Sequence, residues 1–145
     1  MKYTVHIDIN KPRDRVIELF DNPDNLVKWM EGLQSFEHMD GTPGEVGAKS
    51  KLKFKMGKRE MEMIETVTER KPYEFAGTYD AKGVHNKIRA RFEEVSSDVT
   101  RYYTDQEFEF QGIFMKIMGF LMPGAFKKQS MKYLNAFKKF AENED

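Results

Sequence analysis

The sequence contains no cysteine, which excludes a disulfide framework, thiolate metal sites and a cysteine nucleophile. It also has no net charge, because 24 lysines and arginines balance 24 aspartates and glutamates. Proteins that bind nucleic acid usually carry a basic surplus, so no nucleic-acid partner is expected. The N-terminal residues alternate between polar and apolar types and lack the apolar core of a signal peptide. No apolar run approaches the roughly 20 residues of a transmembrane segment. We therefore expect a cytoplasmic protein.

Phenylalanine and methionine are abundant, with 12 and 10 copies in 145 residues. Phenylalanine supplies large apolar area, and methionine fills irregular space and repacks easily. Two interpretations follow, a core rich in these residues or an adaptable apolar cavity. The length fits a single domain covering residues 1–145.

The first third of the chain predicts one strand and two short helices. Apolar and polar residues alternate from Lys2 to Ile9, which is the pattern of a half-buried strand. Pro12 suits the first turn of a helix, and Asn22-Pro23 ends that helix. A second short helix then runs to about Met30 and carries the only tryptophan, Trp29. Gly32 ends it.

The middle of the chain predicts an antiparallel meander, because alternating segments are separated by short turns. The six expected strands cover about Leu33–Met39, Ala48–Met56, Arg59–Arg70, Tyr73–Tyr79, Val84–Val95 and Val99–Phe110.

The tail from Gly112 is expected to be helical in two parts, divided by Pro123-Gly124. From Phe126 onward, apolar and lysine-rich arcs lie on opposite sides of the helix. The lysines form a solvated face or attract anionic lipid. The segment Ile113–Met122 is apolar all round, so it must be buried or meet another apolar surface. It is gripped inside the sheet, covers a cavity as a lid, or serves as a homodimer or transient membrane contact.

The order of these elements resembles the helix-grip fold of the START/SRPBCC superfamily. The local pieces that match are the helix start at Pro12, the segment NPDNLVKW with Trp29, and the loop and strand GTPGEVGAKSKL. They are most similar to small bacterial proteins described as polyketide cyclase/dehydrase or lipid transport. The resemblance covers the whole chain, and the order of the elements supports it more than any single motif does.

The resemblance implies an α+β fold that encloses a cavity. A curved, seven-stranded antiparallel sheet, with two short helices after its first strand, would grip one long C-terminal helix. The cavity would hold a small hydrophobic, aromatic or lipid-like molecule. Catalysis does not follow, because function cannot be derived from the fold alone.

The predicted ligand-binding residues lie on inward strand faces, at the end of the second helix, or in the apolar tail segment. Asn86 is expected to form a hydrogen bond with the ligand, and Tyr102 combines a hydroxyl donor with an aromatic face. The apolar walls are expected to be Trp29, Phe54, Met56, Met61, Met63, Phe75, Ile88, Phe92, Phe114, Met118, Leu121 and Met122. Trp29 could alternatively only anchor its helix on the sheet.

No cofactor and no metal site is expected. The three histidines are far apart in the sequence and lack metal-ligand spacing. Glu65 shares the inward phase of Met61 and Met63, and burial there would raise its pKa and suit it to acid–base chemistry. A β-bulge that shifted the register would instead turn Ile64 inward and Glu65 into water.

Three functions follow from these patterns. The first is binding or transport of a hydrophobic ligand without catalysis. The second is a cyclase or dehydratase that acts on a polyketide-like substrate, with Tyr102 or Glu65 as the acid or base. The third is a membrane-surface or protein-interaction module that uses residues 113–122.

Overall fold

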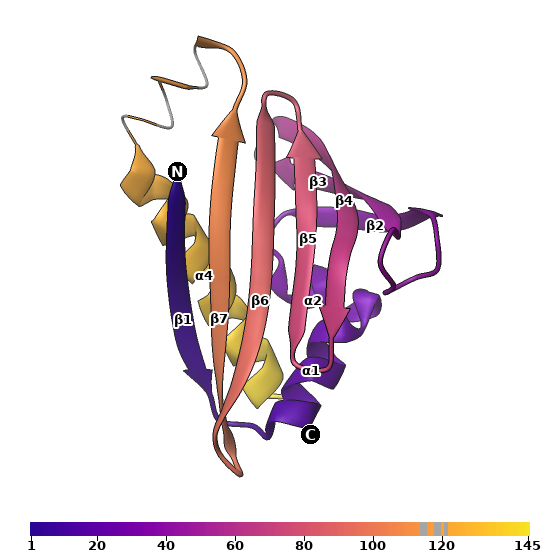
Figure 1. Cartoon of the computed structure of the whole chain (residues 1–145), viewed down its shortest axis with the longest axis vertical. Helices are drawn as coiled ribbons and strands as arrows, with labels where there is room; N and C mark the ends of the chain where they lie inside the picture. The colour runs from indigo at the N-terminus through magenta and orange to yellow at the C-terminus, as the bar shows by residue number, and fades with distance from the viewer. Residues whose placement is uncertain (114–115, 118–119, 121) are drawn as a thin grey trace.

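A computed structural model describes residues 1–113, 116–117, 120 and 122–145. The chain begins with strand β1 (Lys2–Ile9) and the short helices α1 (Arg13–Asp21), η1 (Pro23–Asn25) and α2 (Leu26–Trp29) (Figure 1). The strands β2 (Leu33–Asp40), β3 (Lys49–Met56), β4 (Arg59–Lys71), β5 (Glu74–Ala81), β6 (Val84–Ser96) and β7 (Val99–Phe110) follow. Helix α4 (Pro123–Glu142) comes last. Among these helices, none is long and apolar enough to cross a membrane.

The seven strands form one antiparallel sheet in the order β1-β7-β6-β5-β4-β3-β2. Consecutive strands from β2 to β7 are neighbours, so the predicted meander is confirmed. The first strand returns to pair with the last, with Tyr3 opposite Gln106 and Ile9 opposite Thr100. Strands β1 and β2 are therefore the two edges of the sheet. The short helices lie between them in the sequence and carry the chain from one edge to the other.

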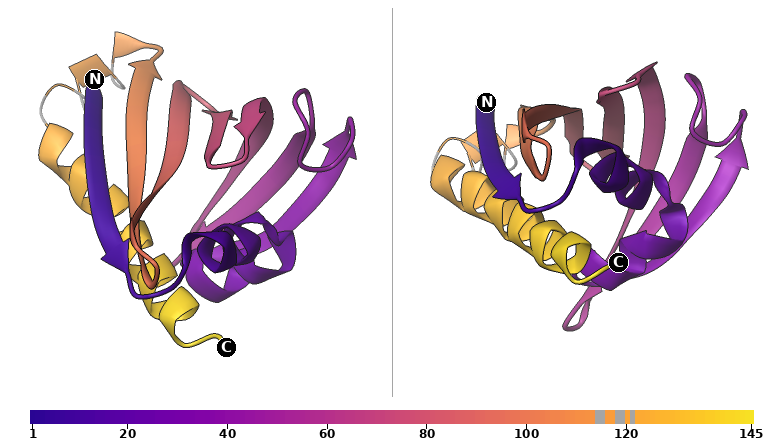
Figure 2. Two further views of the ribbon diagram at one scale, coloured as in Figure 1. Left: turned by 60° about the horizontal axis from the view of Figure 1, so that its bottom comes forward. Right: turned by 90° about the horizontal axis from the view of Figure 1, so that it is seen from below.

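The sheet is strongly curved around its concave face (Figure 2). The register of β4 against β5 shifts between Val67 and Glu69, and such bulges bend a strand and increase its twist. Gly77 lies opposite Val67 on β5. A Cβ atom on Gly77 would come within 3.1 Å of both the Thr66 carbonyl oxygen and the Phe75 ring. The bend therefore depends on a residue without a side chain.

Helix α4 packs against β1 and α2 (Figure 2). It begins at Pro123, which needs no backbone hydrogen bond at that position. Its predicted apolar face is confirmed, since Leu134, Phe137 and Ala141 are buried. That face points at the concave side of the sheet, so the helix covers one end of the concave face closely and leaves space over the rest.

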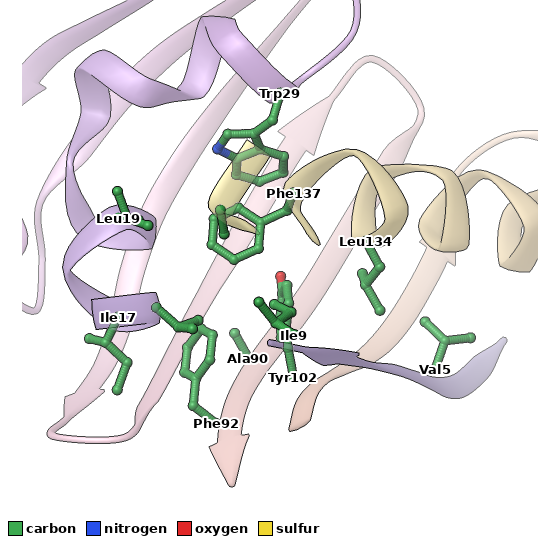
Figure 3. Close-up of a cluster of buried hydrophobic side chains, with 12 residues drawn as sticks. Val5, Ile9, Ile17, Leu19, Trp29, Ala90, Phe92, Tyr102, Leu134 and Phe137 are labelled. Carbon is green, nitrogen blue, oxygen red and sulfur yellow. The ribbon is translucent and has the colours of Figure 1, made fainter. Parts of the chain in front are cut away.

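The short helices close that end of the fold. Asn22 Oδ1 accepts a hydrogen bond from the Asp24 backbone N–H, and Asn25 Nδ2 donates to the Leu19 carbonyl oxygen, at 3.0 and 3.1 Å. These bonds fix the turn between α1 and α2. Trp29 then packs edge-on against Phe137 of α4, with ring centroids 5.0 Å apart (Figure 3).

Candidate functional site

A cavity of about 850 Å³ lies between the concave face of the sheet and the helices. Strands β2 to β7 form its floor, and α1, η1, α2 and α4 contribute side chains to its walls. A second, more open hollow of about 630 Å³ on the convex face is lined by charged side chains such as Lys87 and Glu107. We regard the concave cavity as the candidate site, because it is the more enclosed of the two and its lining is mostly apolar.

Most of the predicted wall residues that the structure describes border this cavity. These are Trp29, Phe54, Met61, Met63, Phe75, Asn86, Ile88 and Tyr102. Trp29 is therefore both a wall of the cavity and the anchor of α2. Its indole nitrogen is buried and has no hydrogen-bond partner among the described residues.

Three other predicted wall residues are not placed in the lining. Met56 is 44% exposed at the hairpin between β3 and β4, where its side chain covers Gly32. Phe92 is buried behind Tyr102, with the two rings stacked at 5.0 Å, because the short helices cover this end of the sheet. Met122 is exposed at the start of α4.

Phe114, Met118 and Leu121 lie outside the described residues. Of the same apolar segment, Ile113 and Phe120 are at least 80% exposed and Ile117 is half-exposed. These three side chains are not gripped inside the sheet. The lid and contact alternatives for this segment stay predictions.

A row of polar side chains crosses the floor of the cavity. Ser50 lies opposite Glu65, Glu65 opposite Tyr79, and Tyr79 opposite Asn86. Directly paired residues project from the same face of a sheet, and all four border the cavity. The floor thus carries a continuous polar strip from β3 to β6 within an apolar surrounding.

Glu65 and Tyr79 form the centre of this polar row. The Tyr79 hydroxyl donates a hydrogen bond to Glu65 Oε2 at 2.5 Å. Burial raises the pKa of Glu65, and the hydrogen bond from Tyr79 lowers it by less. Burial and then the neighbouring carboxylate raise the pKa of Tyr79 well above its usual value, so Tyr79 stays the donor.

The bulge in β4 decides between the two predicted orientations of Glu65. A register shift is present, but it falls between Val67 and Glu69, after Glu65. Pairing of β4 with β3 is regular from Arg59 to Thr66. Glu65 therefore keeps the inward phase, and the prediction that Ile64 replaces it is wrong.

The predicted hydrogen-bonding residue Asn86 is largely satisfied within the protein. Its Nδ2 donates to Gln106 Oε1 and to the Glu107 carbonyl oxygen, each at 3.1 Å. Gln106 Nε2 donates in turn to Thr104 Oγ1 at 2.9 Å. These amides hold one another in place, so they shape the cavity floor.

Tyr102 lies in the aromatic cluster at the closed end of the cavity (Figure 3). Besides Phe92, its ring meets Phe20 and Phe137 edge-on at 5.8 and 5.7 Å. Burial raises the pKa of its hydroxyl, so the phenol remains neutral. The hydroxyl can donate a hydrogen bond to a ligand, but it cannot act as a base at neutral pH.

The exposed part of the lining marks where the cavity opens. Its exposed residues include Asp21 and Pro23 of α1 and η1, and His38 and Gly44 of β2 and the loop that follows it. Arg70 of β4 also lines the cavity and forms an ion pair with Asp21. Burial raises the pKa of Asp21, and the charge and hydrogen bond of Arg70 offset part of that effect.

Sequence reasoning missed Tyr79 and Ser50. The alternation of β5 could have identified Tyr79, because it lies four residues after Phe75 and so shares the same face of the strand. The predicted strand ends at Tyr79, whereas β5 runs on to Ala81. Ser50 gives no signal of its own, since its role follows from the register with Glu65.

Replacement of Glu65 by glutamine is expected to stabilise the protein at neutral pH. A carboxyl group with a raised folded-state pKa stabilises the fold below its unfolded pKa, near 4.5, and loses this contribution as pH rises through the folded value. The free energy of unfolding of Glu65→Gln should therefore exceed that of the native protein by an amount that grows as pH rises above 4.5. Each pKa unit corresponds to about 1.4 kcal/mol.

Urea unfolding of both proteins between pH 4 and 8 measures this difference. Glu62→Gln is the matched control, because Glu62 lies on the same strand and its side chain is 60% exposed. A gain for Glu65→Gln that does not change with pH would contradict the raised pKa.

Comparison with protein-family models and with curated protein sequences gives no match. Comparison with solved structures gives many. The aromatase/cyclase ZhuI from Streptomyces sp. R1128 is 13% identical, with a TM-score of 0.83 over 98% of this chain and 93% of that one. Ara h 8.0201 is 12% identical, with a TM-score of 0.79 over 99% of both chains.

A third similar structure is the di-domain aromatase/cyclase StfQ from the steffimycin biosynthetic pathway. It is 14% identical with a TM-score of 0.74, over 98% of this chain and 45% of that one. At these identities the comparison establishes the fold. The chain has the helix-grip fold that these structures share.

Proposed function

We propose that the protein binds one small, largely apolar molecule in the concave cavity. The observation that supports this most is the cavity itself. About 850 Å³ stays open between the sheet and α4, although large phenylalanine and methionine side chains line it. Ligand pockets usually enclose roughly 300–1,000 Å³ and are mostly apolar with a few polar groups, as this one is.

The polar row gives the bound molecule an orientation. Apolar parts of a ligand would meet side chains such as Phe54, Met63 and Ile88, and a polar group would meet Glu65 and Ser50. The opening beside Arg70 would admit the molecule without unfolding of the sheet. Similarity to aromatase/cyclases and to Ara h 8.0201 supports a cavity-based function and does not decide between binding and catalysis.

We expect the purified protein to bind the neutral apolar dye Nile red in a saturable 1:1 complex. A ligand efficiency of about 0.3 kcal/mol per non-hydrogen atom gives such a dye a dissociation constant on the order of micromolar. Fluorescence titration measures this constant. Native mass spectrometry of the protein as isolated tests in addition for a retained small molecule. Emission that rises linearly without saturation would contradict a discrete site.

A second candidate function is acid–base catalysis on a polyketide-like substrate. The specific observation in its favour is the Glu65 carboxyl, which faces the cavity with a raised pKa and a fixed hydrogen bond from Tyr79. Tyr102 is a weaker candidate, because its phenol stays neutral. Turnover of such a substrate that is lost in Glu65→Gln, with Nile red binding retained, would establish catalysis over simple binding.

A further inference from the structure

The charges that line the cavity are mostly negative. The lining contains the carboxylates of Asp21, Asp24 and Glu65 but only one guanidinium, that of Arg70. Arg70 is already paired with Asp21. The ring nitrogen Nε2 of His38 is 2.7 Å from the Gly41 carbonyl oxygen, so it is engaged as well. The described lining therefore has carboxylates to offer a ligand and no free cation.

Glu65 is the carboxylate that lies inside the cavity, since Asp21 and Asp24 are exposed at its opening. It forms no ion pair with any residue that the structure describes, and the only side chain there that hydrogen-bonds to it is Tyr79. A buried charge is costly unless it is paired, so carboxylates in protein interiors usually have a cationic partner. Within the described fold this partner is missing.

The Glu65 carboxylate has room for one more hydrogen-bond donor. Tyr79 occupies Oε2, which leaves Oε1 as a free acceptor with respect to the described residues. Ser50 faces Glu65 from β3 and can accept or donate a further hydrogen bond. Asn86 continues the row on the far side of Tyr79 but is bound to Gln106. A ligand donor group placed between Ser50 and Glu65 would complete the polar row.

We propose that the molecule bound in the cavity is an apolar amine, whose protonated nitrogen pairs with Glu65 while its hydrocarbon part lies against the aromatic and methionine walls. This inference rests on the proposed binding function and specifies the ligand's chemical class. The ammonium group supplies the counter-charge that Glu65 lacks, and such charge-assisted hydrogen bonds are about twice as strong as neutral ones. A fatty acid or another anionic amphiphile would bring its carboxylate toward Glu65 with no cation to receive it.

Three probes with the same dodecyl chain separate charge from hydrophobicity. Dodecylamine, dodecanol and dodecanoate each compete with Nile red at pH 7, below their aggregation concentrations. We expect dodecylamine to bind about tenfold more tightly than dodecanol, which corresponds to about 1.4 kcal/mol. Dodecanoate should bind most weakly of the three.

The variant Glu65→Gln tests the assigned residue. Glutamine keeps the size of the side chain and an oxygen that accepts from Tyr79, but it removes the charge. We expect the preference for dodecylamine over dodecanol to disappear, because only the amine loses a counter-charge; the ratio of the two dissociation constants is the readout. Glu62→Gln removes the same charge from the outer face of the same strand and should leave the preference unchanged.

The outcomes distinguish this inference from the function on which it rests. Equal binding of dodecylamine and dodecanol, or a preference that survives in Glu65→Gln, overturns the amine class while Nile red binding upholds the cavity as a binding site. Absence of binding by every probe, Nile red included, overturns both.

Discussion

Replacement of Phe137 by alanine is expected to lower the free energy of unfolding by about 3–5 kcal/mol, the range for truncation of a buried phenylalanine. Phe137 has no exposed surface and is the largest fully buried side chain among the described residues. It projects from α4 into the space between the short helices and the sheet (Figure 3). The cost of truncation is highest where the surroundings cannot collapse into the hole.

The neighbours of Phe137 come from three different parts of the chain. Its ring meets Phe20 of α1, Trp29 of α2 and Tyr102 of β7 edge-on, with centroids between 5.0 and 5.8 Å apart. Each edge-to-face pair adds roughly 0.5–1.5 kcal/mol beyond its buried area. Truncation would therefore loosen the contact of α4 with both short helices and with the sheet at once.

Denaturant unfolding followed by circular dichroism measures the effect of Phe137→Ala. Phe140→Ala is the matched control, because Phe140 lies on the same helix and is only partly buried. We expect a smaller loss for the control and an unchanged dependence on denaturant concentration for both variants. Equal losses for the two variants would show that Phe137 is not the centre of the core.

The strands could be predicted closely because their signal is local. In β6 the inward Ile88, Ala90 and Phe92 alternate with charged outward residues, and β7 alternates in the same way with some polar inward positions. The expected 84–95 and 99–110 therefore lie within one residue of Val84–Ser96 and Val99–Phe110. The order of elements then sufficed for the fold. Helix α4 was predictable for the same reason, from the arc that contains Leu134 and Phe137.

The site could be predicted only in part, because parity determines the face of a strand and not what covers that face. Ile88 and Phe92 share one face of β6, yet Ile88 borders the cavity and Phe92 lies in the core beneath α1. Likewise, the orientation of Glu65 depends on which side of it the β4 bulge falls. The pair that it forms with Tyr79 depends on register between strands. Neither is visible in a single strand's sequence.

A double variant that fills the cavity, Ile88→Trp with Met63→Trp, is expected to weaken Nile red binding about 100-fold. Both native side chains border the cavity, from β6 and β4. Ile88 lies opposite Gly77 of the intervening strand, which has no side chain at the paired position, and the Phe75 ring lies over that glycine. Each indole takes up space that the dye must occupy, and forcing extra bulk into filled space costs roughly 1–3 kcal/mol per site. About 2.7 kcal/mol in total gives the expected loss.

The matched control places the same two indoles on the outer face of the same strands, as Lys87→Trp with Glu62→Trp. These residues precede Ile88 and Met63 and are exposed; each forms only a surface ion pair, with Glu109 and Lys53 respectively. Such pairs contribute little to stability, so the control should fold and bind the dye as the native protein does. Circular dichroism and thermal unfolding verify that the cavity-filling variant is folded, because its indoles enter space that is open in the native protein. Unchanged dye affinity in a folded cavity-filling variant would place the ligand outside the concave cavity, whereas loss in both variants would trace the effect to added tryptophan itself.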